Sequence, residues 1–467
     1  MRDPTAARRW LPSVHRPDRW DSMARIVLIS PPFLSHAQPL SVLAHALTRQ
    51  GAEVHFACTE DFAGLAERAG AAFVPLAVTR NANTGVAEAT AQGAAERTRL
   101  REFLEATRAG AVPTLVTQAA HRRQDMLADP DLVLARLRAV DERLRPDWYV
   151  VDQLSYAATL ALHTLGLPYA SFCPGHPGYV LSGADAYFGV PYAWPRALRP
   201  EPAQEAVLTE AARSNDEAFT ALFADFVRRH APSQPPPGRA FALTSPHAVV
   251  YSYPELPWLP AAPPGPGRLF AGHMTDQAPP LDEQWRDRLR RLRERGDRVV
   301  LVALGTFLSA RDDVLRTVTA SVLESLPDTS LVIAAGDRAA ALADLSGERA
   351  VIASVVPQRS LLDQVDAMVH HGGNNSFTES VRAGVPAVVL PFSSDQFAVA
   401  HDAERARAGV VLDPNALTRD GIAEAVHALP ETSGAAVSAL SRQVRDRGPD
   451  WAAGHLLAAM EKLPGRE

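Results

Sequence analysis

Short apolar runs alternate with amphipathic stretches along most of the chain from Met23 onward. Residues 24–30, ARIVLIS, form a continuous apolar run, which is typical of a parallel strand covered on both faces. In residues 36–51 apolar side chains recur at helical spacing, and Gly51 stands where the helix is expected to end. Further strand-like runs at 146–153 and 298–306 continue the series. This alternation predicts parallel sheets joined by crossover helices.

One proline-rich region interrupts the pattern. Prolines between Pro254 and Pro266 are too frequent for a helix or a central strand, so we predict an interdomain linker over residues 254–270. The pattern on both sides is of the same kind, which predicts an N-terminal domain over 23–253 and a C-terminal domain over 271–445. Strand ends that open onto loop-rich edges favour a ligand in the cleft between the two domains.

Composition narrows the class of protein. A chain of 467 residues exceeds the roughly 250–300 residues of a single core, and 46% hydrophobic residues with a mean hydropathy of −0.10 are typical of a soluble globular protein. A net charge of −6 gives no electrostatic case for binding nucleic acid. Cys58 and Cys173 lie in apolar segments, as buried thiols of a cytoplasmic protein would. No membrane span is expected, and the polar, Arg-rich residues 1–22 are predicted to be a disordered extension.

The richest polar cluster is HHGGNNSFTE, residues 370–379. It follows a strand-like run and precedes a helix, so free backbone N–H groups and the helix dipole favour an anion there. Two glycines allow close backbone approach, while Asn375 and Ser376 add neutral donors. Simple capping of the helix by these side chains is the alternative interpretation.

The surrounding stretch, VVPQRSLLDQVDAMVHHGGNNSFTESVRAGVPAVVLPFSSDQFAVA, resembles the nucleotide-sugar signature of family 1 glycosyltransferases. The resemblance implies a GT-B fold of two Rossmann-like, doubly wound parallel-sheet domains facing across a cleft. It also implies that the donor binds mainly the C-terminal domain and the acceptor the N-terminal domain. Residues 446–467, with DWAAGHLLAAMEKL, resemble the C-terminal helix that crosses back to the N-terminal domain in this family.

Carried over by position, the resemblance assigns residues to each part of the donor. Glu379 matches the ribose-binding glutamate, Asp395 and Gln396 match the pair that holds the donor sugar, and Gln358 matches a contact to the nucleotide base. The positions that match ligands of the diphosphate are Thr306, His371, Gly373, Asn375 and Ser376.

Two positions depart from the family pattern. Val355 stands where an aromatic residue, most often Trp, stacks on the base, and Gln364 stands where His is usual. The identity of the nucleotide, UDP or dTDP, therefore stays open.

In the N-terminal half, SPPFLSHAQPL resembles the strand-loop-helix that supplies the general base, which places His36 in that role. An acceptor hydroxyl must lose its proton as it attacks, and imidazole is a suitable base near pH 7. A helix N-terminus should keep His36 neutral until it takes that proton. Asp152 matches the carboxylate that orients this His, although a capping role is its alternative.

We therefore predict an inverting, metal-independent hexosyltransferase that uses a nucleotide diphosphate sugar as co-substrate and needs no other cofactor. The acceptor is expected to be a hydroxyl of a small, partly apolar, natural-product-like molecule, bound by residues 79–85, 100–130 and 173–195. A homodimer is possible. The rival functions are a sugar-nucleotide epimerase and a non-catalytic helper of a partner glycosyltransferase. No spacing of histidines or carboxylates predicts a metal site.

Overall fold

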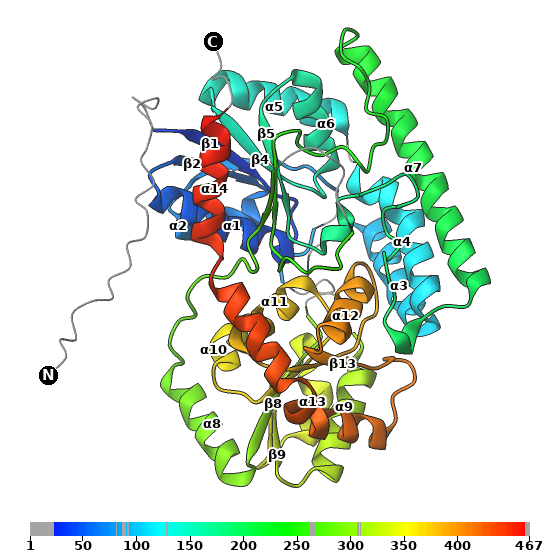
Figure 1. Cartoon of the computed structure of the whole chain (residues 1–467), viewed down its shortest axis with the longest axis vertical. Helices are drawn as coiled ribbons and strands as arrows, with labels where there is room; N and C mark the ends of the chain where they lie inside the picture. The colour runs from blue at the N-terminus through cyan, green and yellow to red at the C-terminus, as the bar shows by residue number, and fades with distance from the viewer. Residues whose placement is uncertain are drawn as a thin grey trace, which may run out of the picture.

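The computed structural model describes residues 23–80, 82–85, 90, 93–127, 129–260, 267–305, 308 and 310–462. They form two α/β domains, one above the other in Figure 1. The predicted extension over residues 1–22 and the predicted diphosphate ligand Thr306 lie outside the described residues. The expectation of two Rossmann-like parallel sheets is confirmed.

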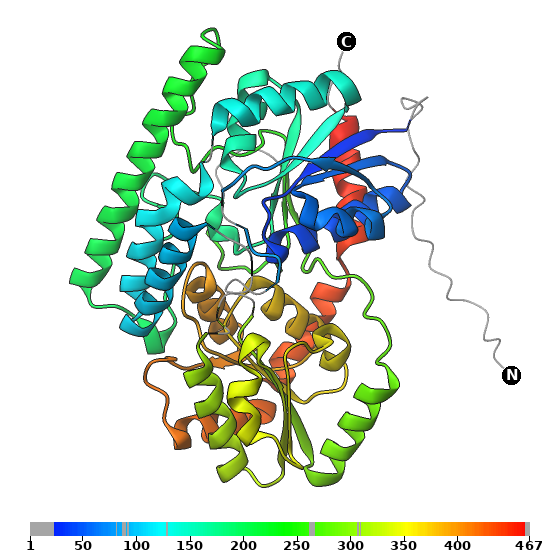
Figure 2. The same ribbon diagram turned by 180° about the vertical axis from the view of Figure 1, so that it is seen from behind.

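Among the described residues, the first domain has a parallel sheet of seven strands in the order β3-β2-β1-β4-β5-β6-β7. Its strands are β1 (Arg25–Ile29), β2 (Glu53–Cys58), β3 (Ala72–Pro75), β4 (Trp148–Asp152), β5 (Tyr169–Cys173), β6 (Ala248–Tyr251) and β7 (Gly267–Phe270). Its helices are α1 (Leu34–Arg49), α2 (Ala63–Ala69), α3 (Ala94–Ala109), α4 (Ala111–Met126), α5 (Pro130–Leu144), α6 (Tyr156–Leu165) and α7 (Pro202–His230). Both views show α3, α4 and α7 along one edge of this domain (Figures 1 and 2).

Within the described part of the chain, the second domain has a parallel sheet of six strands in the order β10-β9-β8-β11-β12-β13. The strands are β8 (Arg298–Ala303), β9 (Thr329–Ala334), β10 (Ala350–Ala353), β11 (Ala367–His370), β12 (Ala387–Val389) and β13 (Gly409–Val411). The helices are α8 (Glu283–Arg295), α9 (Asp312–Ser325), α10 (Gln358–Leu362), α11 (Asn374–Ala383), α12 (Gln396–Arg405) and α13 (Arg419–Arg445).

Strand order locates the ligand-binding edge of each domain. In the first sheet the chain reverses its direction of winding between β1 and β4, and in the second between β8 and β11. The carboxyl ends of such neighbouring strands diverge into a crevice where ligands of doubly wound sheets bind. Continuous apolar runs supply these central strands, and every residue of β4 is buried because helices cover both faces.

The boundary between the domains differs from the predicted linker over 254–270. Residues 267–270 form β7, which pairs with β6 at the edge of the first sheet. The chain therefore crosses to the second domain only after Phe270. Prolines exclude regular structure over the described residues 254–260, but the proline-free Arg268–Phe270 can pair as an edge strand.

The last helix, α14 (Pro449–Glu461), returns to the first domain. It follows α13 directly and packs against α1, β6 and β7, as the upper red helix in Figure 1 shows. Leu456 and Met460 bury their side chains in the core that α1 also fills. In the residues that the structure describes, no helix is both long and apolar enough to cross a membrane.

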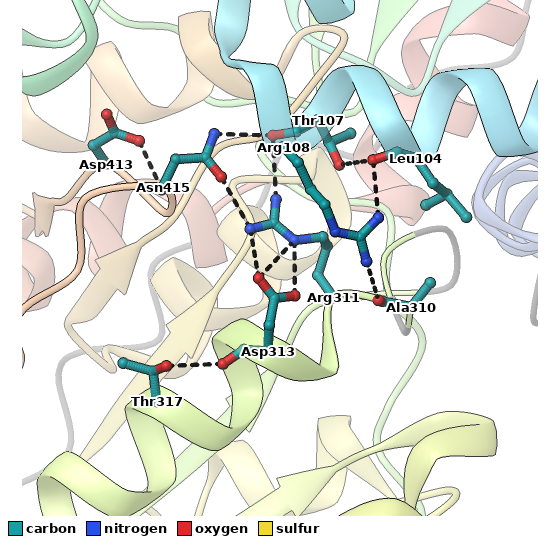
Figure 3. Close-up of polar contacts among 9 residues, drawn as sticks. All are labelled: Leu104, Thr107, Arg108, Ala310, Arg311, Asp313, Thr317, Asp413 and Asn415. Carbon is teal, nitrogen blue, oxygen red and sulfur yellow. Dashed lines mark hydrogen bonds and ion pairs between the residues drawn. The ribbon is translucent and has the colours of Figure 1, made fainter.

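A polar contact joins the end of α3 to the second domain (Figure 3). The carbonyl of Thr107 accepts hydrogen bonds from Arg311 Nη1 at 3.2 Å and from Asn415 Nδ2 at 2.9 Å. Arg311 is only 2% exposed and also binds Asp313 and the side chain of Asn415. Carbonyls in the last turn of a helix lack helical donors, so side chains of the second domain satisfy one here.

Candidate active site

A cavity of about 470 Å³ lies between the domains, at the crevices that the strand order predicts. Residues that follow β1 and β4 line one wall, and residues that follow β8 and β11 line the other. Of the predicted site residues that the structure describes, all but Asp152 and Val355 lie in this lining. Asp152 stands directly behind the wall, in contact with His36.

His36 and Asp152 form a hydrogen-bonded pair. His36 is the third residue of α1, and Asp152 is the last residue of β4, with no exposed side-chain surface. His36 Nδ1 lies 2.9 Å from Asp152 Oδ2, while Asp152 Oδ1 accepts from the backbone N–H of Leu154. The carboxylate thus holds the imidazole by Nδ1, which leaves Nε2 as the nitrogen that can take a proton.

The pKa of His36 corrects one expectation. Burial acts to lower this pKa, but the charge of Asp152 and the hydrogen bond to it outweigh burial, so the pKa lies above its ordinary value. The expected effect of the helix N-terminus, to disfavour the imidazolium, is thus overcome by a carboxylate in contact. His36 is tuned as a stronger base than a free imidazole.

The two histidines after β11 are distinct. His370 is fully buried and accepts the Gly372 N–H at Nδ1 over 2.9 Å, whereas His371 lines the cavity. Burial lowers the pKa of His370 to about 3 and that of His371 to about 4. Both rings are therefore neutral near pH 7, and His371 Nδ1 has no hydrogen-bond partner among the described residues.

Two glycines hold space for the His371 ring. A Cβ on Gly305 would lie 2.6 Å from His371 Cε1, and a Cβ on Gly373 would overlap His371 Nε2. Gly305 also adopts a φ of +77°, which side chains rarely tolerate. The turn after β8 and the turn after β11 therefore enclose His371 between them.

The first residues of α11 serve the domain contact as well as the cavity. Asn375 and Ser376 both line the cavity, but Asn375 Nδ2 donates to the Ser35 carbonyl of α1 at 3.0 Å. Ser35 lies four residues before Pro39, which has no N–H to give to that carbonyl. Pro39 lies inside α1, which begins at Leu34.

Glu379 and Gln358 lie together on the donor side. Gln358 Nε2 donates to Glu379 Oε2 at 2.8 Å. Burial raises the pKa of Glu379, although the hydrogen bond from Gln358 and the charge of Arg359 oppose the rise. Arg359 itself lines the cavity, and its Nη1 is buried without a partner in the part of the chain that the structure describes. Sequence reasoning missed this arginine, although it directly follows Gln358 in the motif.

Val355, the predicted contact to the nucleotide base, lies at the protein surface. Its side chain is 81% exposed on the bend between β10 and α10, and it is not among the residues that line the cavity. Contact between Val355 and a base therefore stays a prediction.

Asp395 and Gln396 both line the cavity but differ in what they offer. Gln396 Oε1 accepts from the backbone N–H groups of Phe392 and Ser393, and its Nε2 donates to Ser393 Oγ. The Gln396 amide is therefore bonded to the loop directly before it. Burial raises the pKa of Asp395, whose Oδ2 accepts the backbone N–H of His176 at 2.7 Å.

All three segments that were expected to bind the acceptor contribute residues to the cavity lining. Residues 100–130 contribute Phe103 and Gln118, and residues 173–195 contribute Tyr179 and Phe188, whose rings pack 4.6 Å apart. Of residues 79–85, Ala82 lines the cavity. Sequence reasoning missed Gln118, which bonds the backbone N–H and the hydroxyl of Ser394 across the cleft.

No cluster of three or more His, Cys, Asp or Glu side chains in the described ranges could hold a metal ion. The groups that line this cavity and can donate to a ligand include backbone amides, amide and hydroxyl side chains, imidazoles, and the guanidinium groups of Arg99, Arg122 and Arg359.

Part of the chain is similar in sequence to known proteins. A family model described as "UDP-glucoronosyl and UDP-glucosyl transferase" matches residues 216–448. The uncharacterized UDP-glucosyltransferase YdhE of Bacillus subtilis (strain 168) is 32% identical over 135 residues, which are 28% of this chain and 33% of that protein. The sterol 3-beta-glucosyltransferase of Aspergillus terreus (strain NIH 2624 / FGSC A1156) is 32% identical over 139 residues, 28% of this chain and 10% of that protein. The chain thus matches a third or less of these relatives' length.

Solved structures show the same fold over nearly the whole chain. The glycotransferase of kitacinnamycin superposes with a TM-score of 0.65 at 22% identity, over 94% of this chain and all of the other. Glycosyltransferase VinC, in complex with dTDP, superposes with a TM-score of 0.62 at 20% identity over the same shares. At these identities the likeness establishes the two-domain GT-B fold. Together with the family match, it shows that the chain belongs to the UDP-glucuronosyl and UDP-glucosyl transferase family, the family 1 glycosyltransferases.

Proposed function

We propose that the protein is an inverting glycosyltransferase that moves a hexose from a nucleotide diphosphate sugar to a hydroxyl of a small, partly apolar acceptor. The observation that carries this proposal is the meeting of two sites in one cavity. A His-Asp pair stands on the first domain, and a helix N-terminus with neutral donors stands opposite on the second.

The steps of the reaction assign a role to each side. The acceptor hydroxyl gives its proton to His36 Nε2 while its oxygen bonds the anomeric carbon, and Asp152 stabilises the imidazolium. The bond from the anomeric carbon to the diphosphate breaks, and the diphosphate leaves with the electron pair. A base on the acceptor side with the leaving group opposite favours a single displacement and hence inversion.

The donor side supplies neutral and dipolar stabilisation. Backbone N–H groups at the start of α11, with Ser376 and His371, would meet the charge that develops on the leaving diphosphate. Glu379, to which Gln358 donates, would bind the ribose, and Asp395 would accept from hydroxyls of the sugar. In this proposal no metal ion and no cofactor beyond the co-substrate takes part.

The nucleotide is proposed as UDP or dTDP. The family description and the curated relatives name UDP-sugars or glucosyl transfer, while the structure of VinC holds dTDP. With Val355 at the surface, Arg359 and Gln358 are the side chains that line the cavity where a base would lie. A guanidinium can stack on a base as well as donate to its oxygens.

The acceptor is proposed as a natural-product-like molecule with an apolar body. Phe33, Val42, Phe103, Tyr179 and Phe188 line the first-domain side of the cavity. Polar and charged side chains stand among these apolar walls, as expected of a pocket for a partly apolar ligand; they include Glu96, Arg99, Gln118, His121 and Arg122.

A donor panel followed by turnover tests the proposal. UDP- and dTDP-sugars are screened by thermal shift, and free nucleotide diphosphate and glycoside are then measured by mass spectrometry with the best donor. His36→Ala should lower turnover by about 10²–10⁴-fold and leave donor binding unchanged, because a general base acts only on the acceptor. His45→Ala, on the same helix but outside the cavity lining, should turn over like wild type.

Failure of the wild type to bind any nucleotide sugar would overturn the proposal. Donor binding without turnover, whatever the acceptor, would favour the non-catalytic helper. Conversion of the donor sugar alone, unaffected by His36→Ala, would favour the epimerase, which needs no acceptor base.

A further inference from the structure

One fully buried carboxylate outside the proposed chemistry ties the two domains together. Asp402, on α12, has no exposed surface and accepts four side-chain hydrogen bonds within the described chain. His176 Nε2 donates at 3.0 Å, Tyr253 Oη at 2.8 Å and Trp258 Nε1 at 2.8 Å, and Tyr192 Oη also donates. We call these five residues the Asp402 cluster. Its acceptor lies in the second domain, and its donors lie in the first.

The cluster is built to keep a charge buried. Burial acts to raise the pKa of Asp402, but the hydrogen bonds from His176, Tyr192 and Trp258 outweigh burial, so the pKa lies below its ordinary value. Burial raises the pKa of Tyr253 well above its usual range, so this phenol remains a donor. A buried carboxylate without such donors would be strongly unfavourable, so the cluster holds only while the domains are together.

His176 is the member that reaches the proposed active site. Its Nδ1 accepts the backbone N–H of Gly178 at 2.9 Å, so the ring proton lies on Nε2 and is donated to Asp402. Its ring also stacks on Tyr192. The His176 ring is thus held by two hydrogen bonds and one stacking contact. The backbone N–H of the same residue donates at 2.7 Å to Oδ2 of Asp395, the carboxylate proposed to hold the donor sugar.

The neighbouring glycine makes this approach possible. A Cβ on Gly175 would lie 2.8 Å from Asp395 Oδ2, so only glycine lets the carboxylate come this close to the loop. The φ of Gly175 is not positive, so its backbone conformation does not require glycine. Glycine is required because a side chain would collide with Asp395.

We propose that His176 is a positioning residue: anchored by the Asp402 cluster, it orients Asp395 for the donor sugar, opposite His36. This inference rests on the proposed function and deepens it. Residues 173–195 carry His176 and also line the acceptor side through Tyr179 and Phe188. The acceptor loop of the first domain thereby completes the sugar site of the second, which binds the sugar fully only when the domains are closed.

Binding of the nucleotide diphosphate with and without its sugar separates positioning from general loosening. The diphosphate contacts only residues assigned to the second domain, whereas the sugar needs Asp395. For His176→Ala, calorimetry should show affinity for UDP or dTDP within about twofold of wild type. The gain in affinity from the attached sugar should fall about tenfold or more, and kcat should fall by at least as much, since a charge-assisted hydrogen bond is involved.

Three further variants sharpen the test. Gly175→Ala displaces Asp395 without touching the cluster and should show the same selective loss of sugar binding, even if His176→Ala folds poorly. His176→Gln keeps an amide donor where Nε2 stands and should recover part of the loss. Arg196→Ala breaks the ion pair of Arg196 with Glu404, another contact to α12, and should behave like wild type.

Loss of diphosphate and sugar binding in equal measure would make His176 a merely structural residue and overturn the inference. Wild-type sugar binding and kcat in both His176→Ala and Gly175→Ala would overturn it as well. A wild-type protein that binds no nucleotide sugar refutes the proposed function instead, which keeps the two failures distinct.

Discussion

At the scale of single residues, the proposed chemistry depends on opposite shifts of pKa in one cavity. Asp152 raises the pKa of His36 against the effect of burial, whereas burial alone lowers the pKa of His371 to about 4. A base on the acceptor side and a neutral donor on the diphosphate side can thus coexist at the same pH. The difference comes mainly from the Asp152 carboxylate, which His36 contacts and His371 does not, with a smaller contribution from Asp395.

Asp152→Asn tests this balance. Removing the charge leaves only the smaller effect of Asp395 to oppose burial at His36, so the pKa of His36 should fall, and the acid limb of a plot of kcat/KM for the acceptor against pH should move to lower pH. The rate on the plateau should fall by about 10²–10⁴-fold, because the imidazolium loses its partner. An unchanged acid limb would show that His36 does not control the profile.

Gly373→Ala tests the space kept for His371. The added Cβ would overlap the imidazole, so either the ring or the turn must move, and affinity for the nucleotide diphosphate should fall by about tenfold or more. The matched control is Gly434→Ala in α13, where a Cβ meets nothing within 4 Å. That control should bind normally and be more stable by about 0.5–1 kcal/mol, since alanine favours a helix. Titration calorimetry measures both affinities.

At the scale of elements, a helix of each domain completes the other. Pro39 removes the donor for the Ser35 carbonyl inside α1, and Asn375 in the first turn of α11 supplies one. Asn374 likewise donates to the carbonyls of Pro174 and Ser252. The helix that would bind the diphosphate is therefore fixed by hydrogen bonds to the acceptor domain.

A double-mutant cycle tests the pairing of Pro39 with Asn375. Asn375→Ala should lower the free energy of unfolding by about 0.5–1.5 kcal/mol, because the Ser35 carbonyl loses its donor. In a Pro39→Ala background the same change should cost less, since the backbone N–H that this substitution introduces can restore the helical bond to that carbonyl. Unfolding in urea measures all four proteins, and strictly additive effects would contradict the pairing.

At the scale of the whole molecule, buried polar contacts hold the two domains closed. The Asp402 cluster lies beside the cavity, and the contact of Arg311 with Thr107 and Asn415 lies at the end of α3 (Figure 3). Such contacts are directional and lose their value when the domains separate, so they define one closed arrangement more sharply than apolar packing does.

Arg311→Ala should weaken this closed arrangement. The change removes a buried guanidinium together with its hydrogen bonds to Asp313, Asn415 and the Thr107 carbonyl, which keeps only the bond from Asn415, so stability should fall by about 2–4 kcal/mol. Arg316→Ala, which breaks an exposed ion pair with Asp344 inside the second domain, should leave stability nearly unchanged, because solvent screens such a pair. Thermal unfolding compares the two variants. Equal losses would mean that the Arg311 contact adds nothing beyond a surface ion pair.

The sequence by itself determined two parallel sheets joined by helices, and the strand-to-helix segments that carry His36 and residues 370–379. These features follow from local periodicity and from residue types at the ends of strands, which neighbouring positions reveal. It also indicated which residues face one cavity, because carboxyl ends of parallel strands share an edge.

Only the tertiary structure decided which hydrogen-bonding groups of each site residue remain free for a ligand. In the folded protein the Gln396 amide bonds its own loop, and the Asn375 amide donates to the Ser35 carbonyl. The side chain of Val355 lies at the surface. The tertiary structure also brought Arg359 and His176 into the site and set the direction of the His36 pKa shift. Hydrogen-bond partners and burial depend on contacts between segments far apart in the chain, which no local pattern encodes.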